Sequence, residues 1–156
     1  MYITSSRKPS AGTRTLCKHL ASFFGCEYFN RGKMGMGEVL NLSHDMPLIV
    51  VGEYHGNPGS LAFYDAEGFC TLSIYFSVMN IPSVYPKRSD LFPVVEGDNE
   101  LVPLINDLLI QEDSEISSVL LLMISGNHMY FKEAEKELFI LRMRSYKVYE
   151  VDESCS

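Results

Sequence analysis

The sequence predicts an α/β protein in which the order strand–helix–strand–hairpin occurs twice. Each of two amphipathic segments, residues 11–24 and 99–109, is followed by an apolar run and then by a pair of alternating strands. Met129–Ala134 in the second hairpin aligns loosely with Ala62–Glu67 in the first. The length of 156 residues and the 46% hydrophobic content suit one compact domain with two similar parts.

The first part, about residues 1–79, begins with a short strand at 2–4 and a polar, basic loop at 5–10. Ser10 suits the N-cap of the first helix, and Gly25 suits its C′ position. Residues at helical spacing form one apolar face of this helix: Leu16, Leu20, Phe23 and Phe24. The sequence therefore predicts a helix that packs on the core and exposes its other side.

The remaining elements of the first part follow from local pattern and turn residues. Their expected ranges are a short strand at 27–29, a glycine-rich loop at 30–37, a short helix at about 37–44, a buried strand at 48–51, a turn-rich loop at 54–59, and strands at 61–65 and 69–77.

A connector at about residues 80–89, with two prolines, separates the first part from the second, about 90–156. The expected elements of the second part are a strand at 91–95, a helix at 99–109, and strands at 119–125, 129–132, 138–144 and 146–151. Pro103 is compatible with the helix if Asn99 is its N-cap, because the first turn has N–H groups without partners.

Charge is distributed unevenly along the chain. The net charge is −7, but residues 1–36 carry six Lys or Arg residues against one Glu, a net +5. The remaining residues carry seven against nineteen, a net −12. Because local charge decides binding, the beginning of the chain is the candidate surface for a polyanion. Arg14 and Lys18 are one helical turn apart, opposite the apolar face, and are expected to be exposed together.

A loop rich in hydroxyl and guanidinium groups that ends at a helix N-terminus suits phosphate oxygens. Tyr54, in a loop, is the best candidate for stacking on a base. The residues expected to contact such a polyanion are Ser5, Ser6, Arg7, Lys8, Ser10, Thr13, Arg14, Lys18, Arg31, Gly32, Lys33 and Tyr54. A solvated basic surface is the alternative interpretation of the cations, and helix capping explains Ser10 equally well.

No catalytic or metal-binding pattern is expected. The loop lacks the Gly-Lys-Ser/Thr ending of a phosphate-binding loop, and Cys17 falls towards the apolar side of its helix. The four cysteines form no CxxC pair, and the four histidines are scattered, so free thiols are expected and neither a metal nor another cofactor. The longest apolar run, 119–124, is too short to span a bilayer, and the N-terminus lacks a signal-peptide pattern. A cytoplasmic protein without a membrane partner is expected.

The segment Ile3–Leu20, ITSSRKPSAGTRTLCKHL, resembles the opening pattern of the Brix-domain family of ribosome-biogenesis proteins. The Arg31-Gly32 turn and the segment Glu53–Leu61, EYHGNPGSL, are similar to later family motifs, so the resemblance covers essentially the whole chain. The chain resembles the minimal, archaeal-type form, without the extensions of eukaryotic members. It departs from the family in its acidic C-terminal part, where Glu133, Glu135 and Glu137 stand close together.

The resemblance implies two α/β halves, each a small sheet with packed helices that resembles the anticodon-binding domain of class II tRNA synthetases. It also implies a non-catalytic factor that binds ribosomal RNA precursor, here through a basic N-terminal face, in rRNA processing and subunit assembly. A basic ribosomal or assembly protein is a second candidate partner, facing the acidic half. The alternatives are a tRNA-binding module and an enzyme of phosphoester chemistry that uses the Ser/Arg/Lys loop.

Overall fold

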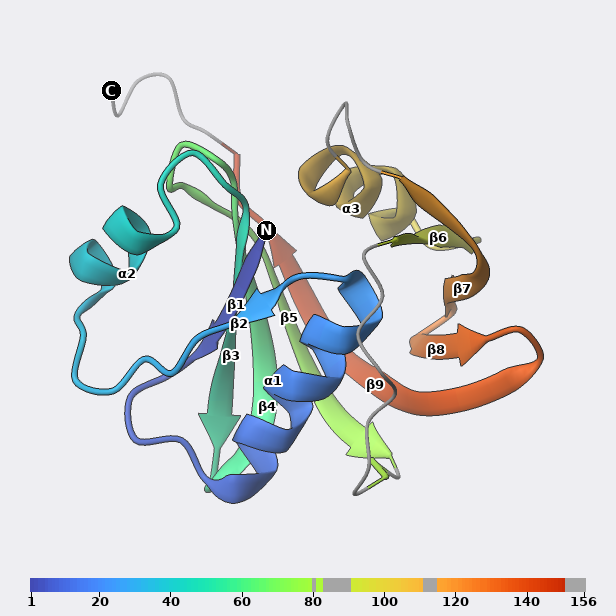
Figure 1. Ribbon diagram of the computed structural model, residues 1–156. Coiled ribbons are helices and arrows are strands. Elements are labelled where there is room, and N and C mark those ends of the chain that lie inside the picture. The colour runs from blue at the N-terminus through green and yellow to red at the C-terminus, as the bar shows by residue number, and fades with distance from the viewer. Residues whose placement is uncertain (80, 83–90, 111–114, 151–156) are drawn as a thin grey trace.

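The computed structural model describes residues 1–79, 81–82, 91–110 and 115–150. Within these residues, one nine-stranded mixed sheet carries three helices (Figure 1). The strand order across the sheet is β2-β1-β3-β4-β5-β9-β8-β7-β6. The α/β class is confirmed, whereas the expected connector at about 80–89 lies outside the described residues, apart from Ile81 and Pro82.

The first part of the chain contains β1 (Tyr2–Ser5), α1 (Ala11–Phe24), β2 (Glu27–Tyr28), α2 (Met36–Leu42), β3 (Leu48–Tyr54), β4 (Asn57–Tyr64) and β5 (Cys70–Met79). The second contains β6 (Phe92–Gly97), α3 (Leu101–Leu109), β7 (Ile116–Ser125), β8 (His128–Glu133) and β9 (Lys136–Val148). β1 is parallel to β3, and β3, β4 and β5 are antiparallel neighbours. β6 is likewise parallel to β7, and β7, β8 and β9 are antiparallel neighbours. The antiparallel pair β5 and β9 joins the two parts.

Both ends of α1 are as expected, whereas the N-cap position of α3 is Glu100 and not Asn99. The Ser10 side chain accepts a hydrogen bond from the Thr13 N–H, and Gly25 takes the left-handed conformation, with φ of 66°, at the end of α1. In α3, the Asn99 Oδ1 accepts from the Leu101 N–H, so Pro103 falls in the first turn, as expected. Both helices therefore begin where a side chain satisfies an unpaired backbone donor.

Two expectations about strands are wrong. The strands expected at 138–144 and 146–151 are one strand, β9, with a register shift opposite Tyr75 and Phe76. A local bulge bends a strand without ending it, and the pattern around Ser145 does not distinguish the two cases. The loop expected at 54–59 is mostly strand, because only His55 and Gly56, both with positive φ, form the turn between β3 and β4.

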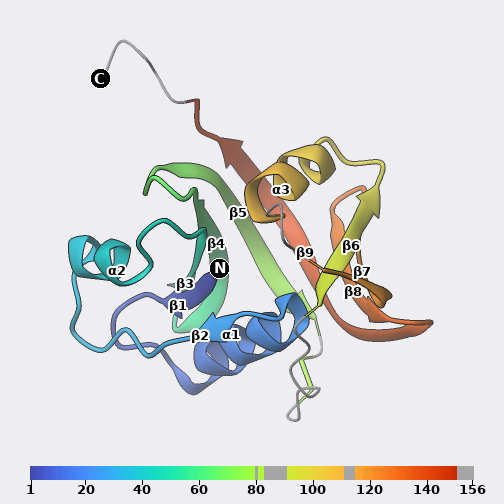
Figure 2. The same ribbon diagram turned by 45° about the horizontal axis from the view of Figure 1, so that its top comes forward.

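The helices cover the two faces of the sheet unequally. α1 and α3 share one hydrophobic core, in which Phe23 of α1 lies 5.0 Å from Phe131 of β8, measured between ring centroids. α2 stands apart, beside β1 and β3 (Figure 2), where its Val39 packs with Leu48 and Val50. The first part is thus covered on both faces near β3, and one core connects both parts. No helix within the described residues is long and apolar enough to cross a membrane.

Candidate nucleic-acid interface

The loop after β1 and the loop before α2 lie against each other. The Arg7 Nε donates to the Met34 carbonyl oxygen at 3.3 Å, and the Arg7 guanidinium lies against Gly35. The glycine-rich loop therefore folds back beside the first basic loop. Arg7, Lys8 and Lys33 are all exposed on these two adjoining loops.

Arg31 has a different place from the one expected. Only 9% of its surface is exposed, and its guanidinium donates to the Met34 carbonyl at 2.9 Å and to the Ser5 carbonyl at 3.3 Å. Arg31 therefore ties the two loops together from inside. Gly32 lies next to it on the surface, in the left-handed conformation with φ of 57°. The sequence could not separate an inward Arg31 from an outward Lys33, because both stand in the same polar loop.

The helix N-terminus that was expected to hold phosphate is already occupied by a carboxylate. The Glu53 Oε2 accepts from the Ser10 N–H at 3.2 Å and from the Thr13 hydroxyl at 2.8 Å. An anion at this position satisfies the exposed N–H group and the helix dipole. Ser10 is the helix cap, Thr13 is buried, and neither is available to an RNA phosphate in this arrangement.

Burial acts to raise the pKa of the Glu53 carboxyl, but hydrogen bonds from Thr13 and Ser10 outweigh it and lower the pKa below its ordinary value. Glu53 is therefore ionised at neutral pH. Its charge stabilises the start of α1 and repels an approaching phosphate.

Ser5 and Ser6 are also less accessible than expected. Ser5 is fully buried, and its hydroxyl donates to the Ser6 carbonyl at 2.8 Å. The Ser6 Oγ is buried without a hydrogen-bond partner among the described residues. The sequence shows their polarity but not that β1 carries Ser5 into the interior or that the Ser6 hydroxyl, just after β1, is enclosed.

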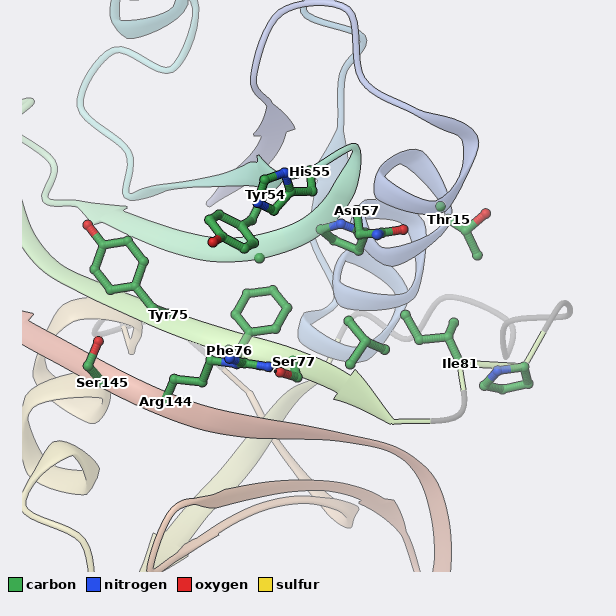
Figure 3. Close-up of a pocket in the computed structure, with 15 residues that line it drawn as sticks. Thr15, Tyr54, His55, Asn57, Tyr75, Phe76, Ser77, Ile81, Arg144 and Ser145 are labelled. Atoms are coloured by element: carbon green, nitrogen blue, oxygen red, sulfur yellow. Dashed lines mark hydrogen bonds between the residues drawn. The ribbon is translucent and has the colours of Figure 1, made fainter.

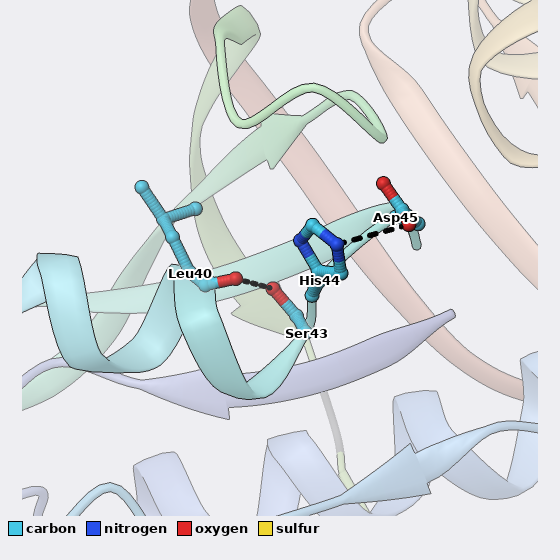
Figure 4. Close-up of polar contacts among 4 residues, drawn as sticks. All are labelled: Leu40, Ser43, His44 and Asp45. Atoms are coloured by element: carbon cyan, nitrogen blue, oxygen red, sulfur yellow. Dashed lines mark hydrogen bonds and ion pairs between the residues drawn. The ribbon is translucent and has the colours of Figure 1, made fainter.

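Arg14 and Lys18 are exposed on one side of α1, as expected. Five exposed cations thus lie on the two loops and on the helix that follows the first loop: Arg7, Lys8, Arg14, Lys18 and Lys33. We call this set the basic face. Among the described residues, the ion pair present joins the exposed His44 and Asp45 near the end of α2 (Figure 4) and involves none of the five.

Tyr54 stands at the tip of the β3–β4 hairpin with 70% of its surface exposed. Its ring makes an edge contact with the His55 ring at 4.2 Å. Gly59 allows this arrangement, because a Cβ there would lie 2.9 Å from the Tyr54 Cβ. The structure thus presents an exposed aromatic side chain at this position.

A pocket of about 930 Å³ opens between the hairpin tip, β5 and β9 (Figure 3). Tyr54 and Asn57 lie on the hairpin side, Thr15 on α1, and Tyr75 and Arg144 on the floor. We call it the slot. Neither Tyr75 nor Arg144 was expected at a binding site, because they come together only through the pairing of β5 with β9. The only sequence signal is weak: polar Ser73, Tyr75 and Ser77 alternate with apolar residues in β5.

Cys17 is a core residue, as expected. Burial raises the pKa of the Cys17 thiol to about 12, and its Sγ contacts the Thr4 carbonyl at 3.7 Å. A thiol that is this weakly acidic and this enclosed is a poor nucleophile, because it stays protonated. The described residues contain no cluster of His, Cys, Asp or Glu that could hold a metal ion.

The structure is that of an α/β protein with one mixed sheet and five exposed cations on two adjoining loops and α1. No family model matches the chain. It is 44% identical over 149 residues to a probable Brix domain-containing ribosomal biogenesis protein of Methanococcoides burtonii, covering 94% of this chain and 96% of the relative. A protein of the same description from Methanosarcina barkeri is 39% identical and is matched over its full length, with 96% of this chain covered.

Two solved structures have a similar fold. The crystal structure of Mil, an archaeal Imp4-like protein, is similar with a TM-score of 0.71 and 27% identity, covering 96% of this chain and 100% of that one. A probable ribosomal biogenesis protein from Aeropyrum pernix shares the fold, with a TM-score of 0.66 and 20% identity over 91% of this chain and 93% of that one. The chain belongs to the Brix domain-containing ribosomal biogenesis proteins, which supports a role in ribosome biogenesis.

Proposed function

We propose that this protein binds ribosomal RNA precursor through the basic face, as a non-catalytic factor in ribosome biogenesis. One observation carries the proposal: five exposed cations lie on two adjoining loops and α1, and none forms an ion pair with a described carboxylate. Unpaired Lys and Arg side chains exchange solvent for phosphate at little cost, and their contacts supply affinity without sequence information. Ser5, Thr13 and Arg31 are left out of this contact set, because they are buried.

The proposal is tested by measuring the binding of the full chain to precursor rRNA fragments at increasing KCl concentration. Suitable fragments are those that crosslink to the protein in cells. Five phosphate contacts on a single strand predict a log–log salt slope of roughly −3.5. A slope near zero would contradict the proposal. Tighter binding to folded tRNA than to any precursor fragment would favour the alternative of a tRNA-binding module.

The absence of catalysis is part of the proposal. It is supported by the enclosed Cys17 thiol and by the carboxylate that occupies the start of α1, where a phosphate-transfer loop would hold its substrate. We expect no hydrolysis of ATP, GTP or phosphate esters above background. A saturable turnover that Arg7→Ala abolishes would instead support the phosphoester enzyme.

We further propose that residues 1–156 form one Brix-like domain of two similar halves, about 1–79 and 90–156, each resembling an anticodon-binding domain of class II tRNA synthetases. The pairings of β1, β3, β4 and β5 follow the same order as those of β6, β7, β8 and β9, which supports this duplication, although the first part carries β2 in addition. The shared core predicts that neither half folds alone, which circular dichroism of the separate halves would test.

The acidic turn at 133–137 is the surface we propose for a basic ribosomal or assembly protein.

A further inference from the structure

The slot exists because β4 and β5 diverge. They pair from Tyr64 opposite Cys70 to Ser60 opposite Tyr75, and the β4 residues before Ser60 curve away with the hairpin tip (Figure 3). On the other side of β5, pairing with β9 continues to Met79. In a flat sheet, three more residue pairs would join β4 and β5 at this place. The opening therefore results from the course of the two strands and is not a gap between loops.

The slot presents two exposed aromatic rings and one cation. Tyr54 is 70% exposed on the hairpin, and Tyr75 is 46% exposed on β5. The Arg144 Nε donates to the Ser77 hydroxyl at 2.7 Å, which fixes one edge of the guanidinium and leaves its other N–H groups to a ligand. Exposed aromatic faces beside Arg are the groups on which unpaired bases stack.

The charge of the slot is unusual for this chain. The chain has 20 Asp and Glu residues, yet none is among the described residues that line the slot. A volume of about 930 Å³ accommodates a nucleotide, since pockets for small ligands span about 300–1,000 Å³. A purely apolar ligand would leave the guanidinium without a partner. An acidic ligand with no flat ring would leave the aromatic rings without a partner.

The slot is continuous with the basic face through α1. Thr15 lines the slot, and on the helix surface it neighbours Lys18, three residues further on. Arg14 is the residue before Thr15 and is exposed with Lys18 on the same side. A strand whose phosphates follow Arg14 and Lys18 therefore passes the mouth of the slot.

We propose that the slot binds an unpaired base of a single RNA strand, stacked on Tyr54 or Tyr75 and held by Arg144. This proposal rests on the proposed RNA binding. It adds that the protein prefers single-stranded RNA to duplex RNA. Phosphate contacts alone do not distinguish the two forms, whereas a base in a duplex cannot enter a pocket without unpairing.

The test measures fluorescence anisotropy with a labelled ten-nucleotide single-stranded RNA and with the duplex of the same sequence. Tyr54→Leu is expected to weaken single-strand binding about tenfold, which corresponds to the loss of one stacked base. The same change should leave duplex binding and the salt slope unaltered, because it removes no cation. Tyr54→Phe should restore single-strand binding, and Arg144→Gln should weaken it.

Phe69→Leu is the matched control, because Phe69 is 53% exposed in the turn at the other end of the β4–β5 hairpin. If Tyr54→Leu and Arg144→Gln bind the single strand like the wild type while Arg14→Glu/Lys18→Glu does not, the slot proposal fails and the basic face stands. The same result is expected if the slot binds a protein segment instead of an RNA base. If none of these variants changes binding, the proposed function itself fails.

Discussion

The connections from β1 to α1 and from β6 to α3 occupy the same position in the two parts of the sheet but carry opposite charge. The first, residues 6–10, contains Arg7 and Lys8, and the helix that follows exposes Arg14 and Lys18. The second, residues 98–100, contains Asp98 and Glu100, and its helix exposes Asp107. In each connection a neutral side chain, Ser10 or Asn99, accepts a hydrogen bond from a backbone N–H at the start of the helix, so the difference in charge is not required for folding.

This comparison shows that topology does not determine where the exposed cations lie. The order of strand pairings is the same in both parts, but only the first part presents cations on its strand-to-helix connection. The first part also carries β2 and α2, whose loop places Lys33 beside Arg7 and for which the described residues of the second part have no counterpart. Function is therefore argued from side chains on a common scaffold.

The largest expected effect tests whether the two parts are energetically separate. Phe131 is fully buried in the second part, yet it stacks on Phe139 at 4.3 Å and meets Phe23 of α1. Phe131→Ala should lower the free energy of unfolding by about 3–5 kcal/mol and leave one cooperative transition. Val39→Ala, in the small cluster under α2, should cost about 2 kcal/mol. Two separate transitions in a urea titration, one at the wild-type midpoint, would show that the parts unfold independently.

The next effect concerns Gly97, the last residue of β6. Gly97 has φ of 137°, and a Cβ at this position would lie 1.9 Å from the Ile124 carbonyl oxygen. Gly97→Ala should therefore destabilise the protein by about 3 kcal/mol. Gly126→Ala is the control, because its φ of 57° is strained but nothing lies within 4 Å, and it should cost about 1 kcal/mol. Equal losses in thermal unfolding would show that backbone strain alone accounts for Gly97.

A smaller effect arises at the start of α1. Thr13→Val removes the hydroxyl that donates to Glu53 and should cost about 1–2 kcal/mol. Because the pKa of Glu53 is lowered in the folded protein, its contribution to stability is complete above the ordinary pKa and is lost as pH falls through the folded pKa.

Glu53→Gln should accordingly be less stable than the wild type at neutral pH, and the difference should shrink as the pH falls through the folded pKa. Removing this negative charge beside the basic face should also strengthen RNA binding, by about twofold. Denaturant titrations at several pH values and binding at one salt concentration measure both effects. Weaker RNA binding by Glu53→Gln would mean that Glu53 acts in binding and not against it.

Local patterns predicted much of the fold, and tertiary contacts decided what they missed. Ser10 and Gly25 mark the two ends of α1, because capping depends on residues close in sequence. Neither the long β9 nor the slot could be predicted, because both depend on how β5 and β9 pair. The basic face was predictable from the clustering of charge along the chain. The inward Arg31 was not predictable, since its partners are backbone carbonyls of its own loop and of the distant β1.

The most direct test of the basic face compares two double charge reversals, one in each part. Arg14→Glu/Lys18→Glu changes exposed residues of α1, and Lys132→Glu/Lys136→Glu changes the same number of cations in the β8–β9 hairpin. Binding to a precursor rRNA fragment is measured across KCl concentrations. The α1 variant should bind far more weakly, with its slope flattened by about 1.4 from roughly −3.5, while the hairpin variant keeps the wild-type slope. If the hairpin variant loses RNA binding and the α1 variant retains it, the interface lies on the second part of the molecule.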